Sequence, residues 1–222
     1  MRTFSIFGVC AINFVIGCRY VWLLRQGRIR PALAMWVFFT IATVGSLATY
    51  LAEGDYGLLD NILNTADLFL VSTVALAIAR YGDRSTRFTR FDFGCLAAVA
   101  LILVAWGLSR QHVAAHLAIQ AILVIAYIPV VHRLWEAERN TESYVMWIGL
   151  MIAPLIGLLS SRGTLATVYA IRSSVCPALL LLLMLRTTVR TRSRPSFDAP
   201  ESGANPVPLC PDTDSPASDG SS

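Results

Sequence analysis

Several polar and ionisable residues occupy positions inside long apolar runs, where their side chains could contact a solute. The densest group opens the run at 61–80, in which Asn64 and Asp67 are three residues apart and share one face of a helix. Asp67 lies about two turns inside that run, which is too deep for a residue that only caps the helix. A charged group inside a membrane costs a few kcal/mol on insertion scales. We therefore predict that Asp67 is functional or forms half of an ion pair, whereas Asp60, just before the run, caps the helix.

A second group lies in the run at 166–186 and includes Arg172 and Ser173. When the two runs are aligned at their C-terminal arginines, Asp67 falls opposite Ser173 and at the depth of Arg172. We hypothesise that Asp67 and Arg172 face each other across a central cavity and pair. The alternative is that the long side chain of Arg172 reaches the outer headgroups.

The run at 113–132 contributes His116 and Gln120, which are four residues apart and share a face. Gln120 is the deeper of the two and is predicted to line the cavity. His116 lies only about one turn inside the run, so we favour an interfacial histidine. Proton coupling through Asp67 or His116 is the alternative, because both groups titrate when their surroundings shift them.

A row of small hydroxyl residues follows the run at 32–52. Its members recur every three residues: Thr40, Thr43, Ser46 and Thr49. Small residues let membrane helices approach one another closely. We assign this row to helix packing, with a polar pathway as the alternative.

These residues lie in seven apolar runs separated by short polar segments. The runs span residues 4–24, 32–52, 61–80, 92–109, 113–132, 144–161 and 166–186. A spanning helix needs roughly 20 apolar residues, and only a helix or closed barrel satisfies its backbone in hydrocarbon. The chain is 55% hydrophobic and 14% charged, against about 25% charged residues in soluble domains. The sequence predicts an all-α, multi-pass protein with seven transmembrane helices in the lipid bilayer of the cell (inner or plasma) membrane.

The arginines indicate the orientation of these helices. With the N-terminus outside, thirteen arginines fall in inside segments and three, Arg2, Arg110 and Arg162, fall in outside ones. Cytoplasmic loops carry such an excess of basic residues. The N-terminus is therefore predicted to lie outside and the C-terminus in the cytoplasm. The net charge of +4 is not taken as a sign of nucleic acid, because the basic residues form short clusters between apolar runs.

The composition excludes several kinds of chemistry. There is no lysine, which excludes a lysine Schiff base such as retinal attachment. The five cysteines form no C-x-x-C pair, so neither a metal site nor a disulfide framework is inferred. No catalytic motif occurs at an interpretable spacing, and we expect neither an enzyme nor a cofactor. The tail at 191–222 is rich in Pro, Ser, Asp and Gly and is predicted to be disordered in the cytoplasm.

The sequence indicates a weak internal duplication. The segments at 16–36 and 125–147 each combine the end of an apolar run, a charged loop and a Met-Trp pair. The predicted plan is a first three-helix repeat at 1–80, a linker helix at 81–110 and a second three-helix repeat at 111–190. Because one linker helix reverses the chain, both repeats have the same orientation, as in parallel-repeat transporters with a site near the midplane.

This 3+1+3 plan resembles the SWEET and PQ-loop superfamily of seven-helix small-solute transporters. Pro129, Ser143 and Trp147 stand where family members carry a proline near the cytoplasmic end of a triplet's first helix, a serine after the loop and then an aromatic residue. Val130 replaces the glutamine of the PQ signature, and Tyr20 stands where the first repeat would carry its proline. The resemblance implies a carrier that works by alternating access, with Pro129 as a hinge.

The resemblance also implies where a solute binds. Family members contact substrate through asparagines on the third and seventh helices. Asn64 fits the first position, while the seventh helix carries Arg172 and Ser173 instead, which favours a small polar solute that is anionic or zwitterionic over a neutral sugar. The predicted substrate-binding residues are Asn64, Asp67, Gln120, Arg172 and Ser173. A seven-helix sensor or receptor-like protein without transport is the alternative, and a homo-oligomer is left open.

Overall fold

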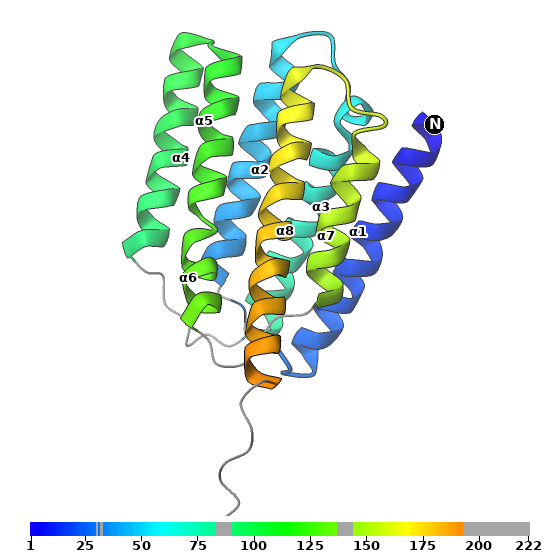
Figure 1. Ribbon diagram of the computed structural model, residues 1–222. Helices are drawn as coiled ribbons and strands as arrows, with labels where there is room; N and C mark the ends of the chain where they lie inside the picture. The colour runs from blue at the N-terminus through cyan, green and yellow to red at the C-terminus, as the bar shows by residue number, and fades with distance from the viewer. Residues whose placement is uncertain (30, 32, 83–89, 137–143, 193–222) are drawn as a thin grey trace, which may run out of the picture.

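The fold is a bundle of roughly parallel helices, seen in a computed structural model that describes residues 1–29, 31, 33–82, 90–136 and 144–192 (Figure 1). Within these residues every regular element is helical. The elements are α1 (Arg2–Arg25), α2 (Leu33–Glu53), the 3-10 turn η1 (Leu58–Asn61), α3 (Ile62–Tyr81), α4 (Arg90–Ser109), α5 (His112–Ile125), α6 (Ile128–Glu136), α7 (Tyr144–Gly157) and α8 (Thr164–Arg192). The prediction of an all-α protein is confirmed, while the predicted tail lies outside the described residues from position 193 onward.

Five segments of the described chain are helical, long and apolar enough to cross a membrane: α1, α2, η1 with α3, α4, and α8 up to Val189. The two remaining predicted spans, 113–132 and 144–161, form the shorter apolar helices α5 and α7. The helices are thus those of a membrane protein, with two of the predicted spans shortened.

The predicted run at 113–132 is divided because the helix tightens and turns after Ile125. The amide of Tyr127 donates to the carbonyl of Val124 at 3.0 Å, an i to i−3 bond that ends the regular α-helix. Pro129, the second residue of α6, has no N–H to donate to the carbonyl of Ile125. A continuous helix would leave that carbonyl unpaired, and the chain turns instead.

Two sets of helices, α1 to α3 and α5 to α8, share one packing pattern. In the first set, α3 packs between α1 and α2. In the second set, α8 packs between α7 and the α5–α6 pair. The sets meet where α1 packs against α7 and where α2 packs against α5, while α3 and α8 touch only slightly at the centre. The helix between the sets, α4, packs against α5 and α2 at the edge of the bundle (Figure 1).

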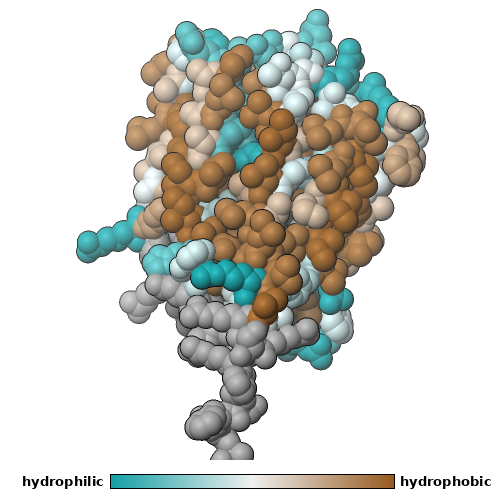
Figure 2. All heavy atoms as spheres, viewed as in Figure 1, coloured by the Kyte–Doolittle hydropathy of each residue, from teal (hydrophilic) through white to brown (hydrophobic). Residues whose placement is uncertain are grey.

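The face of the bundle seen in Figure 2 is largely apolar, with hydrophilic residues gathered toward its upper and lower ends. We call the end where α1 begins the upper end, as in Figure 1, and the end where α1 finishes at Arg25 the arginine-rich end. Large apolar side chains of α1 and α4 are widely exposed, among them Phe14 and Leu101. Such surface suits hydrocarbon rather than water.

Asp60 joins the two sets at the upper end through Arg162 and pairs within its own set with Arg2. The Asp60 carboxylate lies 2.8 Å from Arg2 and 3.6 Å from Arg162, and the Arg162 amide donates to the Asp60 carbonyl at 3.0 Å. The same carboxylate accepts the Gly57 amide at 2.9 Å and so caps η1. The expected capping role of Asp60 is confirmed for η1, whereas Asn61 caps α3 by accepting the Asn64 amide.

Candidate functional site

A network of polar side chains joins helices in the upper half of the bundle. Ser46 of α2 is its branching point, because its Oγ accepts hydrogen bonds from Asn64 Nδ2 at 3.0 Å and from Gln120 Nε2 at 2.8 Å. All three side chains are buried. A polar group buried without a partner is costly, so these bonds hold α2, α3 and α5 in one relative register.

Arg172 extends the network to α8. Its Nε donates to Gln120 Oε1 at 2.7 Å, and an Nη donates to Ser173 Oγ at 2.8 Å. Its Cζ lies 4.9 Å from the ring centroid of Tyr169, within cation–π range. A guanidinium has five N–H donors. These two bonds use two of them, and the Tyr127 hydroxyl also lies within hydrogen-bonding reach of the Arg172 side chain. The half-buried Arg172 is therefore held firmly while it keeps donors for an anion.

Asp67 contacts Tyr169 rather than Arg172. Its Oδ2 accepts a hydrogen bond from the Tyr169 hydroxyl at 2.9 Å, and within the described residues no direct ion pair joins Asp67 to Arg172. Tyr169 stands three residues before Arg172 and shares its face of α8, so its ring lies against the guanidinium and its hydroxyl reaches α3. The hypothesis of a direct pair is replaced by an Asp67–Tyr169–Arg172 chain.

Unsatisfied polar atoms lie beside this chain. Asn64 Oδ1 is buried and has no hydrogen-bond partner in the part of the chain that the structure describes. One turn after Ser173, α8 contains Pro177, which has no N–H, so the Ser173 carbonyl lacks its usual helical donor. Asn64 Oδ1 and the Ser173 carbonyl therefore keep accepting capacity that helical bonding does not use.

His116 is fully buried against α2, which differs from the interfacial position favoured above. Its Nδ1 lies 3.1 Å from both the Thr49 hydroxyl and the Ser46 carbonyl. Its Nε2 lies 3.3 Å from Gln120 Nε2. The position one turn into the run is covered because α2 packs closely on α5 there. His116 thus belongs to the network through Gln120, whereas Asp67 is connected to it through Tyr169 and Arg172.

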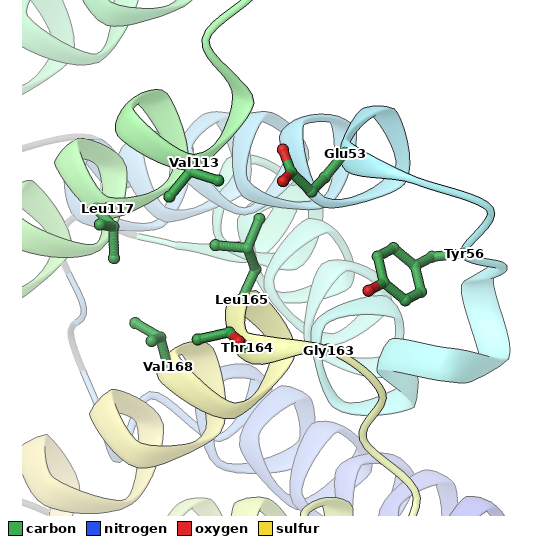
Figure 3. Close-up of a pocket in the computed structure, with 8 residues that line it drawn as sticks. All are labelled: Glu53, Tyr56, Val113, Leu117, Gly163, Thr164, Leu165 and Val168. Atoms are coloured by element: carbon green, nitrogen blue, oxygen red, sulfur yellow. The ribbon is translucent and has the colours of Figure 1, made fainter.

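A pocket of about 290 Å³ lies at the upper end of the bundle (Figure 3). Its walls come from the ends of α2, α5 and α8 and the turn after α2: Glu53, Tyr56, Val113, Leu117, Gly163, Thr164, Leu165 and Val168. Leu117 and Val168 stand one helical turn before Gln120 and Arg172. Arg172 donates to Gln120 in the bond that joins α8 to α5. The pocket walls on α5 and α8 thus stand one helical turn from Gln120 and Arg172 along these helices, and its lining residues are distinct from those of the network.

Pro129 lies outside the polar network, where α6 begins. The turn between α5 and α6 bends the polypeptide just before it. Its hinge role stays a prediction. Ser143, which supported the resemblance, lies outside the described residues.

The sequence interpretation missed two members of the network. Ser46 was assigned to helix packing together with the other hydroxyl residues of its row. Thr40 and Thr49 do bond to carbonyls of their own helix, whereas Ser46 links three helices. Tyr169 was not assigned a role. Its spacing of three residues before Arg172 was the available signal, since that spacing places an aromatic ring beside a cation on a helix.

Replacing Ser46 with alanine is expected to lower the free energy of unfolding by roughly 2 kcal/mol, because the buried amides of Asn64 and Gln120 both lose their acceptor. Reversible unfolding in mixed micelles measures this change. The matched control is Ser174→Ala, which removes only a bond to the Ala170 carbonyl in the same helix and is expected to cost less than about 0.5 kcal/mol. Equal effects of the two substitutions would contradict the branching role.

Within the described chain, no three His, Cys, Asp or Glu side chains are grouped closely enough to hold a metal ion. Comparisons with family models, with curated proteins and with solved structures found no match to this chain.

Proposed function

We propose that this protein is a membrane carrier for a small polar, anionic or zwitterionic solute, working by alternating access. Two parallel three-helix repeats, 1–80 and 111–190, rock about a site between them, and the helix within 81–110 links them. The α5–α6 pair acts as one kinked span, so that seven spans place the N-terminus outside and the C-terminus in the cytoplasm. This topology follows from the arginine excess at the arginine-rich end.

The helix packing supports a two-fold relation between the repeats. If α1, α2 and α3 correspond to α5–α6, α7 and α8, then each contact has a counterpart. The α1–α7 contact corresponds to α5–α2, and α3 between α1 and α2 corresponds to α8 between α5–α6 and α7. The axis then passes between α3 and α8, where direct packing is slight. Parallel-repeat carriers bind their solutes at such an axis.

The observation that carries the proposal is Arg172, held by polar side chains inside the bundle. An intramembrane arginine is costly unless it has a role, and here Gln120, Ser173 and Tyr169 position it. The walls of the pocket stand one helical turn away on α5 and α8. Its free N–H groups match a carboxylate or phosphate, while Asn64 Oδ1 offers an acceptor to a hydroxyl or ammonium group. A small acid or zwitterion satisfies both.

Blocking the pocket is expected to stop uptake. Leu117→Trp places a large ring in a space of about 290 Å³ and should reduce the initial rate of solute uptake into proteoliposomes by at least about tenfold. Labelled carboxylic acids, amino acids, phosphate esters and neutral sugars are screened first with the unaltered protein. A pH gradient across the vesicles then tests coupling through Asp67 or His116.

The control is Leu101→Trp, which adds the same ring on the exposed face of α4 and is expected to leave uptake unchanged. Failure of the unaltered protein to move any solute of these classes would overturn the carrier proposal and favour the sensor alternative. Uptake that survives Leu117→Trp would separate transport from this pocket.

A further inference from the structure

The arginine-rich end carries a cluster of cations and aromatic rings that the proposed transport site does not use. Tyr81, the last residue of α3, lies between two arginines. The Cζ of Arg25 is 5.3 Å from its ring centroid, and the Cζ of Arg80 is 5.9 Å from it. A second pair stands beside it, with Arg28 Cζ 5.6 Å from the Trp22 ring centroid. We call these five residues the α1–α3 cluster.

The local backbone determines this arrangement. After α1 ends, Gly27 adopts a φ of 66°, and the Arg28 amide donates back to the Leu23 carbonyl at 3.1 Å. This reversal is a Schellman-type C-terminal cap, which favours glycine because of its positive φ. It returns Arg28 to the side of Trp22. The close packing of α1 on α3 brings Arg25 to Tyr81.

The positive charge of the cluster is not neutralised within the described residues. The ion pairs found there involve Asp60 at the opposite end, and Arg25, Arg28 and Arg80 have no carboxylate partner in the described chain. All three arginines are exposed. Three guanidinium groups on neighbouring helix ends present a concentrated site for an anion with several oxygens, such as a phosphate.

The surface above the cluster indicates that the anion is attached to hydrocarbon. Phe7, Phe14 and Cys18 are exposed on α1 and share a face with Arg25, because their spacings of 4, 7 and 11 residues follow the helical repeat. The stripe from Phe14 to Arg25 is about 16 Å long at 1.5 Å per residue. The hydrocarbon of one leaflet is roughly 15 Å deep. The length of the stripe therefore matches that of one acyl chain whose headgroup lies at the arginines.

We propose that the α1–α3 cluster binds the phosphate of an anionic phospholipid whose acyl chain lies along the exposed stripe of α1. The phosphate oxygens accept hydrogen bonds from Arg25 and Arg80, and Arg28 adds charge from the side of Trp22. The two rings lie at the depth of the headgroup boundary, where aromatic residues favour the interface. This inference depends on the chain lying in a bilayer and is independent of whether it transports a solute.

The test compares lipid retention by the full chain and by Arg25→Gln/Arg80→Gln in native mass spectrometry. Protein is released from nanodiscs of phosphatidylglycerol or of phosphatidylcholine. An arginine near an anionic membrane contributes roughly fivefold in affinity, so the double variant is expected to bind phosphatidylglycerol about 25-fold more weakly. Retention of phosphatidylcholine is expected to be unchanged.

Two further variants separate a lipid site from general effects. Arg110→Gln removes an equally exposed arginine at the upper end and is expected to bind phosphatidylglycerol like the unaltered chain. Arg25→Lys/Arg80→Lys keeps the charge and is expected to restore most of the retention, even if the glutamine variant folds poorly.

Three outcomes would overturn the proposal: equal retention by the glutamine variant and the unaltered chain, an equal loss in Arg110→Gln, or retention of free glycerol phosphate as strong as that of the lipid. The last outcome would assign the cluster to a soluble anion. A salt-dependent preference for phosphatidylglycerol that the glutamine variant loses would support the lipid site.

Discussion

Replacing Arg172 with methionine is expected to reduce uptake of an anionic solute by about a hundredfold or more. Methionine fills a similar volume but removes the charge that a carboxylate or phosphate needs. Loss of two charge-assisted hydrogen bonds corresponds to roughly 3 kcal/mol, which is more than a hundredfold in an equilibrium constant. Gln120 Oε1 and Ser173 Oγ also lose their contacts with the guanidinium. Initial uptake rates into proteoliposomes measure the effect.

Two variants distinguish solute binding from folding. Arg172→Lys keeps the charge without the planar fork and is expected to retain a partial rate, with most of its loss in KM. Arg110→Met removes an arginine from the upper surface and is expected to transport normally. If Arg172→Met elutes as a monodisperse protein and takes up solute at the normal rate, Arg172 does not bind the solute.

Replacing Gly149 with valine is expected to destabilise the bundle by roughly 1–3 kcal/mol, the usual range for overpacking. Gly149 lies where α7 crosses α1. A Cβ there would overlap Ile16 Cδ1, lie 2.9 Å from Ile16 Cγ1 and lie 3.6 Å from Ile12 Cγ2. Ile16 is buried, so it has little room to move. The apparent midpoint of thermal unfolding in detergent measures the loss.

Gly107→Val is the matched control, because it makes the same change within a helix. A Cβ at Gly107 meets no atom within 4 Å, so this variant is expected to change the midpoint little. Ile16→Ala combined with Gly149→Val should recover part of the lost stability by opening space at the contact. Equal midpoints for Gly149→Val and Gly107→Val would show that α1 and α7 do not pack as closely as described here.

Much of the helical architecture could be predicted from hydropathy. Long apolar runs must form helices in hydrocarbon, because no other open backbone arrangement satisfies its own hydrogen bonds there. Hydropathy does not detect a break within an apolar run, so 113–132 was predicted as one helix. Pro129 marked the weak point in the sequence, but the turn lies before it, at Ala126 and Tyr127.

The candidate site was predicted in part. The cost of burying polar groups singled out Asn64, Asp67, Gln120, Arg172 and Ser173, and the structure connects Asn64 to Ser173 through Ser46, Gln120 and Arg172. Aligning two helix ends predicts that Asp67 and Arg172 lie at similar depth. It does not predict which side chain stands between them, because that depends on how α3 and α8 are rotated about their axes. Tyr169 occupies that space.

Hydropathy and run length were enough to predict a helical chain that is apolar enough for a membrane, and to pick out the polar residues inside its apolar runs. Those properties are local, since they depend on the length of each run and the solvent around it. By contrast, the packing of the helices is what lets Ser46 join Asn64 to Gln120, buries His116 and sets Tyr169 between Asp67 and Arg172. The physical reason is that a hydrogen bond between helices depends on the rotation and crossing of both helices, which packing of the whole bundle sets.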